Sequence, residues 1–522
     1  MKQQVDLIVC NAKVYTINTN FDVEESFAVK NGKFIDVGNT KFILENYNAK
    51  EIIDLKGKAV FPGFIDAHCH FYGLGMTLQQ ANLVSTKSYQ EVLDVLQVFY
   101  DKNKPNFITG RGWNQNNWEL KQFPNKAKLD KIFPNIPVAI NRIDGHAMLA
   151  NQCALDLAKI TISTTINGGD ILKENGKLTG ILLDNAMNLV YEIMPKPSKK
   201  LLKKALIEAQ EKCFSYGLTS VHDADLKQDV LELMEEMQTN NELIMRIYAM
   251  VYATDSSLDY YLNRSKIKTQ SLNIGAFKIY MDGALGSKGA RMKEAYLNNE
   301  GKKGIYVTSK ETLFKFGKRI KDSDFQLNVH AIGDAANEVV LKTFVEKLEI
   351  NKERRWRVEH AQIVDVKDLH YYKTILPSVQ PTHATSDMYW VEKLIGSQRM
   401  TGAYAYKDLL DLHGVLPLGT DFPIEDVNPF KTFYAAVARK DANGFPKNGF
   451  QIKNALTRKQ TIKGMTIWGA YAAFEEKQKG SIEVGKLADF IVLDQDIMTV
   501  DIDNIIDTKV LRTYLGGELV YA

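Results

Sequence analysis

Short apolar runs alternate with amphipathic segments through the middle of the chain. In segments such as LLKKALIEAQEKCF at 201–214 and ANEVVLKTFVEKLE at 336–349, apolar residues recur at intervals of three and four, which is typical of helices. Other runs have the length and composition of buried strands: VFPGFIDAH from 60, LTSVHD from 218, MRIYAMV from 245, IGAFKIYM from 274, FQLNVHA from 325, RWRVEHA from 355, LPSVQP from 376 and GVLPLGTD from 414. This alternation predicts parallel βαβ units, and eight such strands predict an α/β fold of the TIM (β/α)8 barrel type.

The first two of these strands are separated by far more chain than the others. The first ends near His70 and the second begins at Leu218, whereas one βαβ unit needs only about thirty residues. We therefore predict a barrel domain over 60–479 with a large insertion over 71–215 after its first strand. We expect the insertion to form a lid or substrate-binding subdomain.

Both ends of the chain consist of short strand-like runs separated by turns. The N-terminal runs are VDLIVCNAKVYTI, SFAVKNGKFIDVG and EIIDLKGKAV, and the Asn31-Gly32 pair in the second is a hairpin signal. The C-terminal runs ADFIVLDQD and VLRTYLGGELVYA have the same character. We predict that residues 1–59 and 480–522 together form one β-sandwich domain.

The composition is that of a large globular protein. Of 522 residues, 45% are hydrophobic and 25% are charged, and the net charge is only +3. Lysine and arginine are spread along the chain, so we expect neither a nucleic acid nor a membrane as partner. The N-terminal apolar stretch at 7–10 is too short for a signal peptide. Four cysteines without a CxxC pair favour a reduced, cytoplasmic protein.

Histidines gather where the predicted strands end. In a strand, side chains at i and i+2 point to the same side, so His68 and His70 would present two imidazoles to one face. On its own this motif also fits a strand end with two satisfied polar residues. In a TIM barrel, however, the chemistry lies at the carboxyl ends of the strands. Five of the nine histidines fall there, together with one lysine and one aspartate: His68, His70, His222, Lys278, His330, His360 and Asp421.

The donor types in this group predict a metal centre. Imidazoles from strands one, five and six with a carboxylate from strand eight suit Zn2+ or another divalent transition metal, with one or two ions per chain. Lys278 would be repelled as an ammonium, but a lysine that has reacted with carbon dioxide becomes an anionic carbamate that can bridge two ions. The alternative is a protonated Lys278 paired with a carboxylate such as Asp282.

The order of several motifs resembles a known family. PGFIDAHCH, KIYMDGALGS, NVHAIGD, RVEHAQ and LGTDFPIE, with GRGWNQ, DGHAMLAN and GSIEVGKLADFIVLD, resemble the amidohydrolase superfamily and its third subgroup, the N-substituted formamide deformylase-like and exoenzyme-regulator-like proteins. The resemblance spans nearly the whole chain. It implies metal ligands at His68, His70, His330, His360 and Asp421, with Lys278 as a carbamylated bridge.

The implied chemistry is hydrolysis by water that a metal activates. Metal binding lowers the pKa of a coordinated water and polarises a substrate carbonyl. Asp421 is both a ligand and the candidate general base, which returns the proton to a departing amine; the alternative for Asp421 is a helix cap. No GxSxG elbow is present, so a serine hydrolase mechanism has little support.

The remaining polar candidates concern substrate binding and ligand orientation. Four lie in the insertion and are expected to contact the substrate: Arg111, Trp113, Asp144 and His146. Trp113 would pack on an apolar group of the substrate or, alternatively, belong to the core of the insertion. His222 is expected behind the metal ligands, which it would orient. The other histidines, His370, His383 and His413, are interpreted as structural or surface residues.

The sequence therefore predicts a cytoplasmic, metal-dependent hydrolase of a non-peptide C–N bond. We expect a small-molecule linear amide, such as an N-substituted formamide or N-acyl amine, as substrate. One alternative is a deaminase or cyclic-amide hydrolase, because the same activated water attacks amidine and ring carbons. Another is a metal-binding regulator without turnover, which the intact ligand set disfavours. A homodimer is considered as the assembly.

Overall fold

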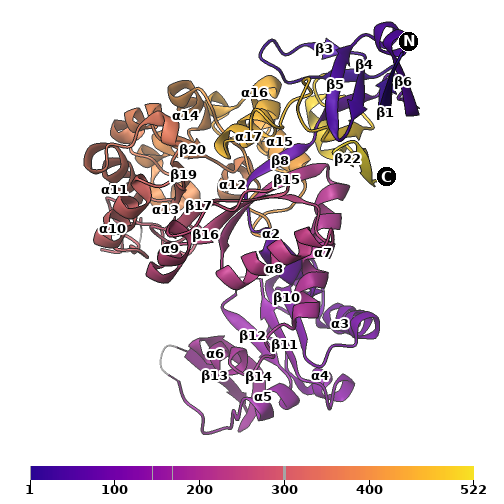
Figure 1. Ribbon diagram of the computed structural model, residues 1–522. Coiled ribbons are helices and arrows are strands. Elements are labelled where there is room, and N and C mark those ends of the chain that lie inside the picture. The colour runs from indigo at the N-terminus through magenta and orange to yellow at the C-terminus, as the bar shows by residue number, and fades with distance from the viewer. Residues whose placement is uncertain (1, 144, 167–168, 298–300) are drawn as a thin grey trace. The chain divides into compact units, whose positions relative to one another are not determined.

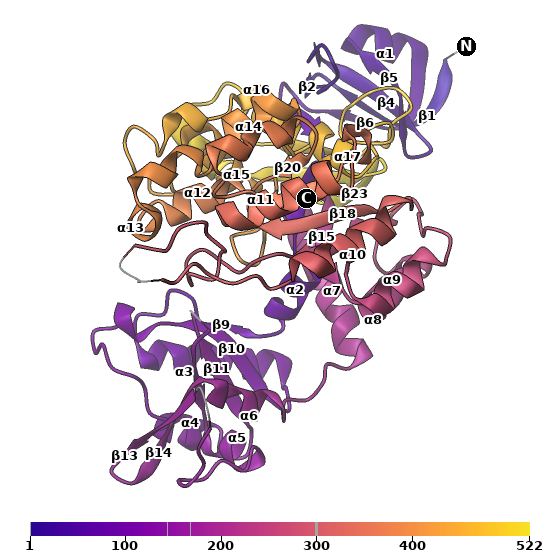
Figure 2. The same cartoon turned by 90° about the vertical axis from the view of Figure 1, so that its left-hand side faces the viewer.

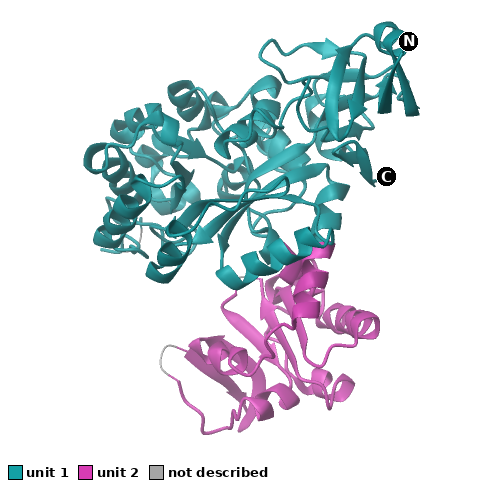
Figure 3. Cartoon of the chain, viewed as in Figure 1, with its two compact units in different colours: residues 1–73, 209–522 teal, residues 74–208 magenta. Residues whose placement is uncertain are grey.

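The computed structural model describes the chain except residues 1, 144, 167–168 and 298–300 (Figure 1). It divides into two compact units, one of residues 1–73 and 209–522 and the other of residues 74–208 (Figure 3). The smaller unit lies within the range predicted for the insertion.

The centre of the larger unit is a sheet of seven parallel strands in the order β20-β19-β18-β17-β16-β15-β8. Its strands are β8 (Phe64–Cys69), β15 (Leu218–Leu226), β16 (Arg246–Tyr252), β17 (Leu272–Tyr280), β18 (Gln326–Ala331), β19 (Arg357–His360) and β20 (Leu376–Ser378). Nearly every residue in them is buried, as expected for parallel strands covered on both faces. The first seven predicted barrel strands are therefore confirmed.

The eighth predicted strand closes the ring without forming a regular strand. The Gly419 N–H donates to the Val379 carbonyl at 3.0 Å, and the Ala67 N–H donates to the Leu418 carbonyl at 3.1 Å. This segment therefore bridges β20 and β8. Pro417 in this segment lacks an N–H to donate to a strand ladder. A Cβ atom at Gly419 would lie 2.6 Å from the backbone nitrogen of His68, so only glycine allows this close approach.

Helices surround this sheet within the larger unit (Figures 1 and 2). They are α2 (Phe71–Leu78, which ends in the smaller unit), α7 (Lys199–Ser215, which begins in the smaller unit), α8 (Gln228–Thr239), α9 (Asp255–Leu262), α10 (Lys310–Lys321), α11 (Asp334–Lys342), α12 (Pro381–Asp387), α13 (Val391–Ile395), α14 (Tyr406–His413), α15 (Pro429–Ala438), α16 (Arg458–Gly464) and α17 (Ile467–Ala472). The helix predicted over 336–349 begins earlier, as α11, and its last part is a π-helical turn at Thr343–Lys347. No described helix is long and apolar enough to cross a membrane.

The two ends of the chain pair in one sheet. A six-stranded sheet contains β2 (Lys13–Tyr15), β3 (Val23–Glu24) and β7 (Ala59–Pro62) with β21 (Phe490–Leu493), β22 (Val510–Leu515) and β23 (Glu518–Tyr521). A four-stranded sheet contains β1 (Gln3–Cys10), β4 (Ser26–Lys30), β5 (Lys33–Gly38) and β6 (Tyr47–Asp54), beside helix α1 (Thr40–Asn46). Phe27 and Phe34 of the smaller sheet pack with Phe490 of the larger one. Asn31 and Gly32 have φ of 52° and 73°, as the predicted hairpin requires.

The unit of residues 74–208 has its own six-stranded sheet and core. Its strands are β9 (Ala81–Asn82), β10 (Ile108–Trp113), β11 (Val138–Arg142), β12 (Ala147–Ala150), β13 (Gly169–Glu174) and β14 (Lys177–Asp184). Its other helices are α3 (Tyr89–Asn103), α4 (Ala127–Ile132), α5 (Gln152–Leu157) and α6 (Asn188–Tyr191). Leu93 and Leu96 of α3 pack with Ile140 of β11 in this core.

Candidate metal centre

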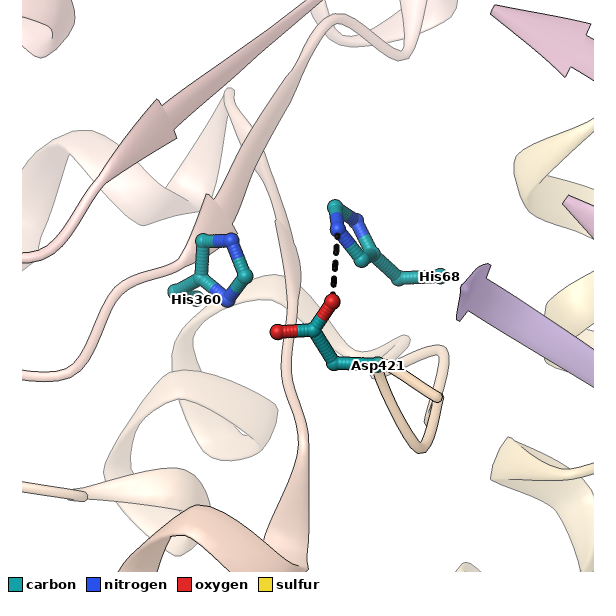
Figure 4. Close-up of side chains that lie close together, drawn as sticks. All are labelled: His68, His360 and Asp421. Carbon is teal, nitrogen blue, oxygen red and sulfur yellow. Dashed lines mark ion pairs between the residues drawn. The ribbon is translucent and has the colours of Figure 1, made fainter. Parts of the chain in front are cut away.

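Six of the seven polar residues predicted at the strand ends lie together in one cup, formed by His68, His70, Lys278, His330, His360 and Asp421. His68 at the end of β8 and His70 just beyond it both face Asp421, with their Nε2 atoms 3.7 and 3.2 Å from its Oδ1. The ligand atoms of His68, His360 and Asp421 all lie within 4.8 Å of one another (Figure 4). The ring centroid of His330 is 4.5 Å from that of His360. The structure therefore brings the predicted imidazoles and the carboxylate together.

The hydrogen bonding of these residues fits a bound cation. Both ring nitrogens of His330 and the Oδ1 atom of Asp421 are buried without a hydrogen-bond partner among the described residues. Buried polar atoms in proteins nearly always have partners. Imidazole nitrogens and a carboxylate oxygen are the donors that divalent zinc-like ions prefer. The residues present therefore fit a divalent metal.

Lys278 points into the same cup from β17. Its Nζ lies 3.4 Å from Nε2 of His68, and its side chain is fully buried. Burial lowers the pKa of Lys278, which favours the neutral amine. Asp282, the alternative partner considered for this lysine, instead accepts backbone hydrogen bonds from Arg291, Ile332 and Gly333 at 2.8–3.0 Å.

Glu359 supports His68 from within the barrel and was missed in the sequence. Its Oε2 atom lies 2.7 Å from Nδ1 of His68, and its side chain is fully buried. Burial alone would raise its pKa, but His68 and Arg357 lower it to about 2. Glu359 is therefore a carboxylate that fixes the ring of a candidate ligand, as is usual at metal sites.

The backbone explains why Glu359 was missed. Successive residues of a strand point to opposite faces, so Glu359 and His360 should not both face the interior. His360 has a φ of 75°, in the left-handed region, which breaks this alternation at the end of β19. Its Nδ1 is 2.8 Å from the Gln380 Oε1, which accepts its proton.

His222 is one step further from the candidate ligands. Its Nδ1 lies 3.1 Å from a guanidinium nitrogen of Arg357, which is in turn 3.7 Å from Glu359. Burial and Arg357 hold the pKa of His222 well below its usual value. The direct contact with His68 thus comes from Glu359 rather than from His222, whose orienting role stays a prediction.

His383 lies at the centre and not in the structural or surface setting assigned to it from the sequence. Its Nε2 is 3.2 Å from Oδ2 of Asp421, and its side chain is 12% exposed. Helix α12 follows β20 and carries His383 in its first turn. A histidine so soon after a barrel strand is the sequence signal that could have placed His383 at the metal centre. Burial alone would raise the pKa of Asp421, but the neighbouring imidazoles of His383 and His70 hold it well below its usual value.

The residues predicted for substrate binding lie in the other unit. Trp113 is fully buried and donates from Nε1 to the Ile140 carbonyl at 2.9 Å, which favours the insertion-core interpretation over contact with a substrate. Arg111 is exposed on β10. His146 is exposed, with Nδ1 2.8 Å from the Asp184 carboxylate. Asp144 lies outside the described residues. Substrate contacts by Arg111 and His146 stay predictions.

A sequence model of the amidohydrolase family matches residues 51–521. The chain belongs to the amidohydrolase family. Membership confirms the resemblance seen in the motifs and indicates a hydrolase. This amidohydrolase is 32% identical to YtcJ of Bacillus subtilis (strain 168) over 521 residues, which cover 97% of this chain and 98% of YtcJ.

Two further similarities extend over nearly the whole amidohydrolase. It is 26% identical over 546 residues to the N-substituted formamide deformylase of Arthrobacter pascens, with 100% of this chain and 99% of that enzyme covered. Its fold matches the crystal structure of an uncharacterized metal-dependent hydrolase from Pyrococcus furiosus with a TM-score of 0.80 at 28% identity, covering 94% of this chain and 100% of that one.

Proposed function

We propose that this amidohydrolase is a metal-dependent hydrolase of linear amides, such as N-substituted formamides or N-acyl amines. The observation that carries the proposal is the geometry of Asp421. Its Oδ1 accepts no hydrogen bond from the described residues and faces His68 and His70, while Oδ2 contacts His383. The similarity to an N-substituted formamide deformylase supports the substrate class.

The residues proposed to hold the metal are His68, His70, His330, His360 and Asp421. A divalent ion bound there would supply Lewis acidity that lowers the pKa of water and polarises an amide carbonyl. Glu359 keeps the proton of His68 on Nδ1, so Nε2 offers its lone pair to the cup. Gln380 does the same for His360.

Asp421 is proposed to move the proton. It takes a proton from the water that attacks the amide carbon and gives it to the leaving nitrogen, because amines leave poorly unless they are protonated. The contact of His383 with Oδ2 holds the carboxylate so that Oδ1 stays directed at the cup. The amide C–N bond breaks, and a carboxylic acid (formic acid from a formamide) and an amine are released.

Lys278 is proposed to carry a carbamate. Its neutral amine attacks carbon dioxide, a C–N bond forms, and one amine proton is released, which leaves an anionic group able to bridge two ions. The competing arrangement has one ion held by His68, His70 and Asp421 with Lys278 protonated. Intact-protein mass at neutral pH and metal content per chain distinguish the two, because only the first predicts an added carbamate and two ions.

Amine release from a panel of formamides, N-acyl amines and cyclic amides tests the function. Zn2+-loaded protein should hydrolyse linear amides, and His330→Ala should lose both metal and activity. Asp421→Asn should lose turnover more completely than metal, because an amide still contacts the ion but cannot act as a base. His370→Ala is the matched control, since His370 is exposed and hydrogen-bonds only the nearby Lys367 carbonyl among the contacts described.

Other outcomes would contradict the proposal. Ammonia release from amidines, or ring opening as the only reaction, would identify a deaminase or a cyclic-amide hydrolase. Metal binding without turnover of any C–N substrate in the panel would favour a regulator.

A further inference from the structure

Asp225 and Tyr280 form a hydrogen-bonded pair beside His70. The Tyr280 hydroxyl donates to Oδ2 of Asp225 at 2.7 Å. The other oxygen, Oδ1 of Asp225, lies 3.4 Å from Nδ1 of His70. Both histidines of the HCH motif therefore have a carboxylate at Nδ1, Glu359 for His68 and Asp225 for His70.

The backbone of Asp225 sets it apart from ordinary strand residues. Its φ is 58°, in the left-handed region that non-glycine residues rarely adopt, and the register between β15 and β16 shifts between Asp223 and Leu226. His360 and Asp421, both candidate metal ligands, have φ of 75° and 65°. Such conformations destabilise the backbone and gather at functional sites, where the surrounding structure enforces them.

Tyr280 contacts two further members of the cup. It follows Lys278 by two positions on β17, so both side chains lie on the same side of the strand. Nζ of Lys278 is 4.8 Å from the centroid of the Tyr280 ring, and the ring of His330 is 5.1 Å away. The phenol is thus held by packing, and its hydroxyl is fixed against Asp225.

The two supporting carboxylates differ in what holds them. Glu359 is fully buried beside Arg357, whereas the Asp225 side chain is 38% exposed. An exposed carboxylate on a short side chain rotates unless a donor fixes it. The Tyr280 hydroxyl supplies such a donor.

We propose that Asp225 and Tyr280 are a positioning pair for His70. Asp225 accepts the Nδ1 proton of His70, which leaves Nε2, 3.2 Å from Oδ1 of Asp421, as the atom that binds metal. Tyr280 acts through Asp225 by fixing the orientation of its carboxylate. The inference rests on the proposed metal centre and adds two residues to it.

Metal affinity of three variants tests the pair. Asp225→Asn removes the charge but suits the left-handed backbone, which asparagine tolerates well. Tyr280→Phe removes the hydroxyl and keeps the ring against Lys278 and His330. Tyr260→Phe is the matched control, because the Tyr260 hydroxyl donates to Glu232 at 3.2 Å in the same kind of pair between α9 and α8.

The metal-free proteins are titrated with Co2+ and Zn2+ against a chelator, and the Co2+ absorption spectrum reports the ligand field. Asp225→Asn should weaken binding about 10–100-fold, as is typical when a partner of a ligating histidine is lost. Tyr280→Phe should weaken it less and alter the Co2+ spectrum, and Tyr260→Phe should do neither. The double variant should bind no more weakly than Asp225→Asn, because Tyr280 acts through Asp225.

The negative results distinguish failure of the positioning pair from failure of the metal centre. Suppose that the wild-type protein binds metal and that Asp225→Asn and Tyr280→Phe both keep its metal affinity and Co2+ spectrum. This result would overturn the positioning pair but not the metal centre. Lower melting temperatures of the metal-free variants with unchanged metal affinity would show a structural role and overturn it as well. Wild-type protein that binds no divalent metal would overturn the centre itself, and the pair with it.

Discussion

Replacement of Glu359 by glutamine tests how the barrel interior supports the metal centre. The side chain is fully buried between His68, 2.7 Å from Oε2, and Arg357, 3.7 Å from Oε1. Glutamine has the same length and can still accept the Nδ1 proton through its carbonyl oxygen. The perturbation is therefore the loss of one buried negative charge with little change of shape.

The expected effect on metal binding follows from the hydrogen bond. Bonds to charged groups contribute about 1.5–3 kcal/mol and neutral ones about 0.5–1.5 kcal/mol, so about 1–2 kcal/mol is lost at His68. This corresponds to a decrease of about 5–30-fold in metal affinity. It agrees with the typical effect of about 10–100-fold for residues that support metal-ligating histidines.

The expected effect on folding comes from Arg357. Its guanidinium is fully buried, and burial lowers its pKa while Glu359 opposes that change. A buried charge that loses its partner costs about 3–5 kcal/mol. At 3.7 Å the pair is longer than a direct hydrogen bond, so we expect about 3 kcal/mol of destabilisation, at the lower end of that range.

Metal affinity is measured by chelator competition, and stability by urea unfolding of the metal-free protein. Glu476→Gln is the matched control, because Glu476 pairs with Arg355 at 2.9 Å near the opposite end of β19 and is partly exposed. It should lower stability by less than about 1 kcal/mol and leave metal affinity unchanged. Wild-type metal affinity in Glu359→Gln would refute the role assigned to this carboxylate.

Two further predictions concern His383 and Asp223, whose carboxylate accepts the backbone N–H groups of Phe71 and Tyr72. His383→Gln should lower kcat about tenfold, because it removes the contact of about 1.4 kcal/mol that holds Oδ2 of Asp421. Elemental analysis should show unchanged metal content, and a wild-type kcat would contradict the prediction. Burial raises the pKa of Asp223 to about 7, from about 3.9 when unfolded. The native state therefore binds this proton more tightly, and stability should fall by up to about 4 kcal/mol between about pH 4 and pH 7. Urea unfolding of metal-free Asp223→Asn should lack this component, so that the variant gains stability relative to wild type as pH rises; parallel pH curves would contradict it.

The sequence predicts the barrel well because its signals are local and repeated. Strands such as β16 and β17 are buried and mostly apolar runs, which is a strong strand signal. The eighth segment is harder to predict. Its apolar pattern is strand-like, but Pro417 cannot donate to a ladder, and the close approach of Gly419 to the His68 backbone is a tertiary contact that the pattern does not reveal.

The candidate ligands could be predicted because each lies at or just beyond the carboxyl end of a predicted strand, where the fold directs side chains to one rim. His383 could not be placed in the same way, because it lies on helix α12 and reaches Asp421 only through the turn that follows β20. Trp113 shows the opposite case. Its motif suggested substrate contact, but a large indole with one N–H bonded to a carbonyl is equally suited to a core.

The residues that support the centre are hidden for a specific physical reason. With strict alternation in β19, only one of Glu359 and His360 would face the barrel interior. The left-handed backbone at His360 lets both do so: His360 is a candidate ligand, and Glu359 orients His68. Asp225 reaches His70 after a similar step in β15. Period-two patterns describe extended backbone only, so they fail at these positions. Each of these left-handed residues destabilises the native state, and contacts within the surrounding barrel must offset that cost. The backbone strain therefore lies beside the candidate metal ligands rather than elsewhere in the strands.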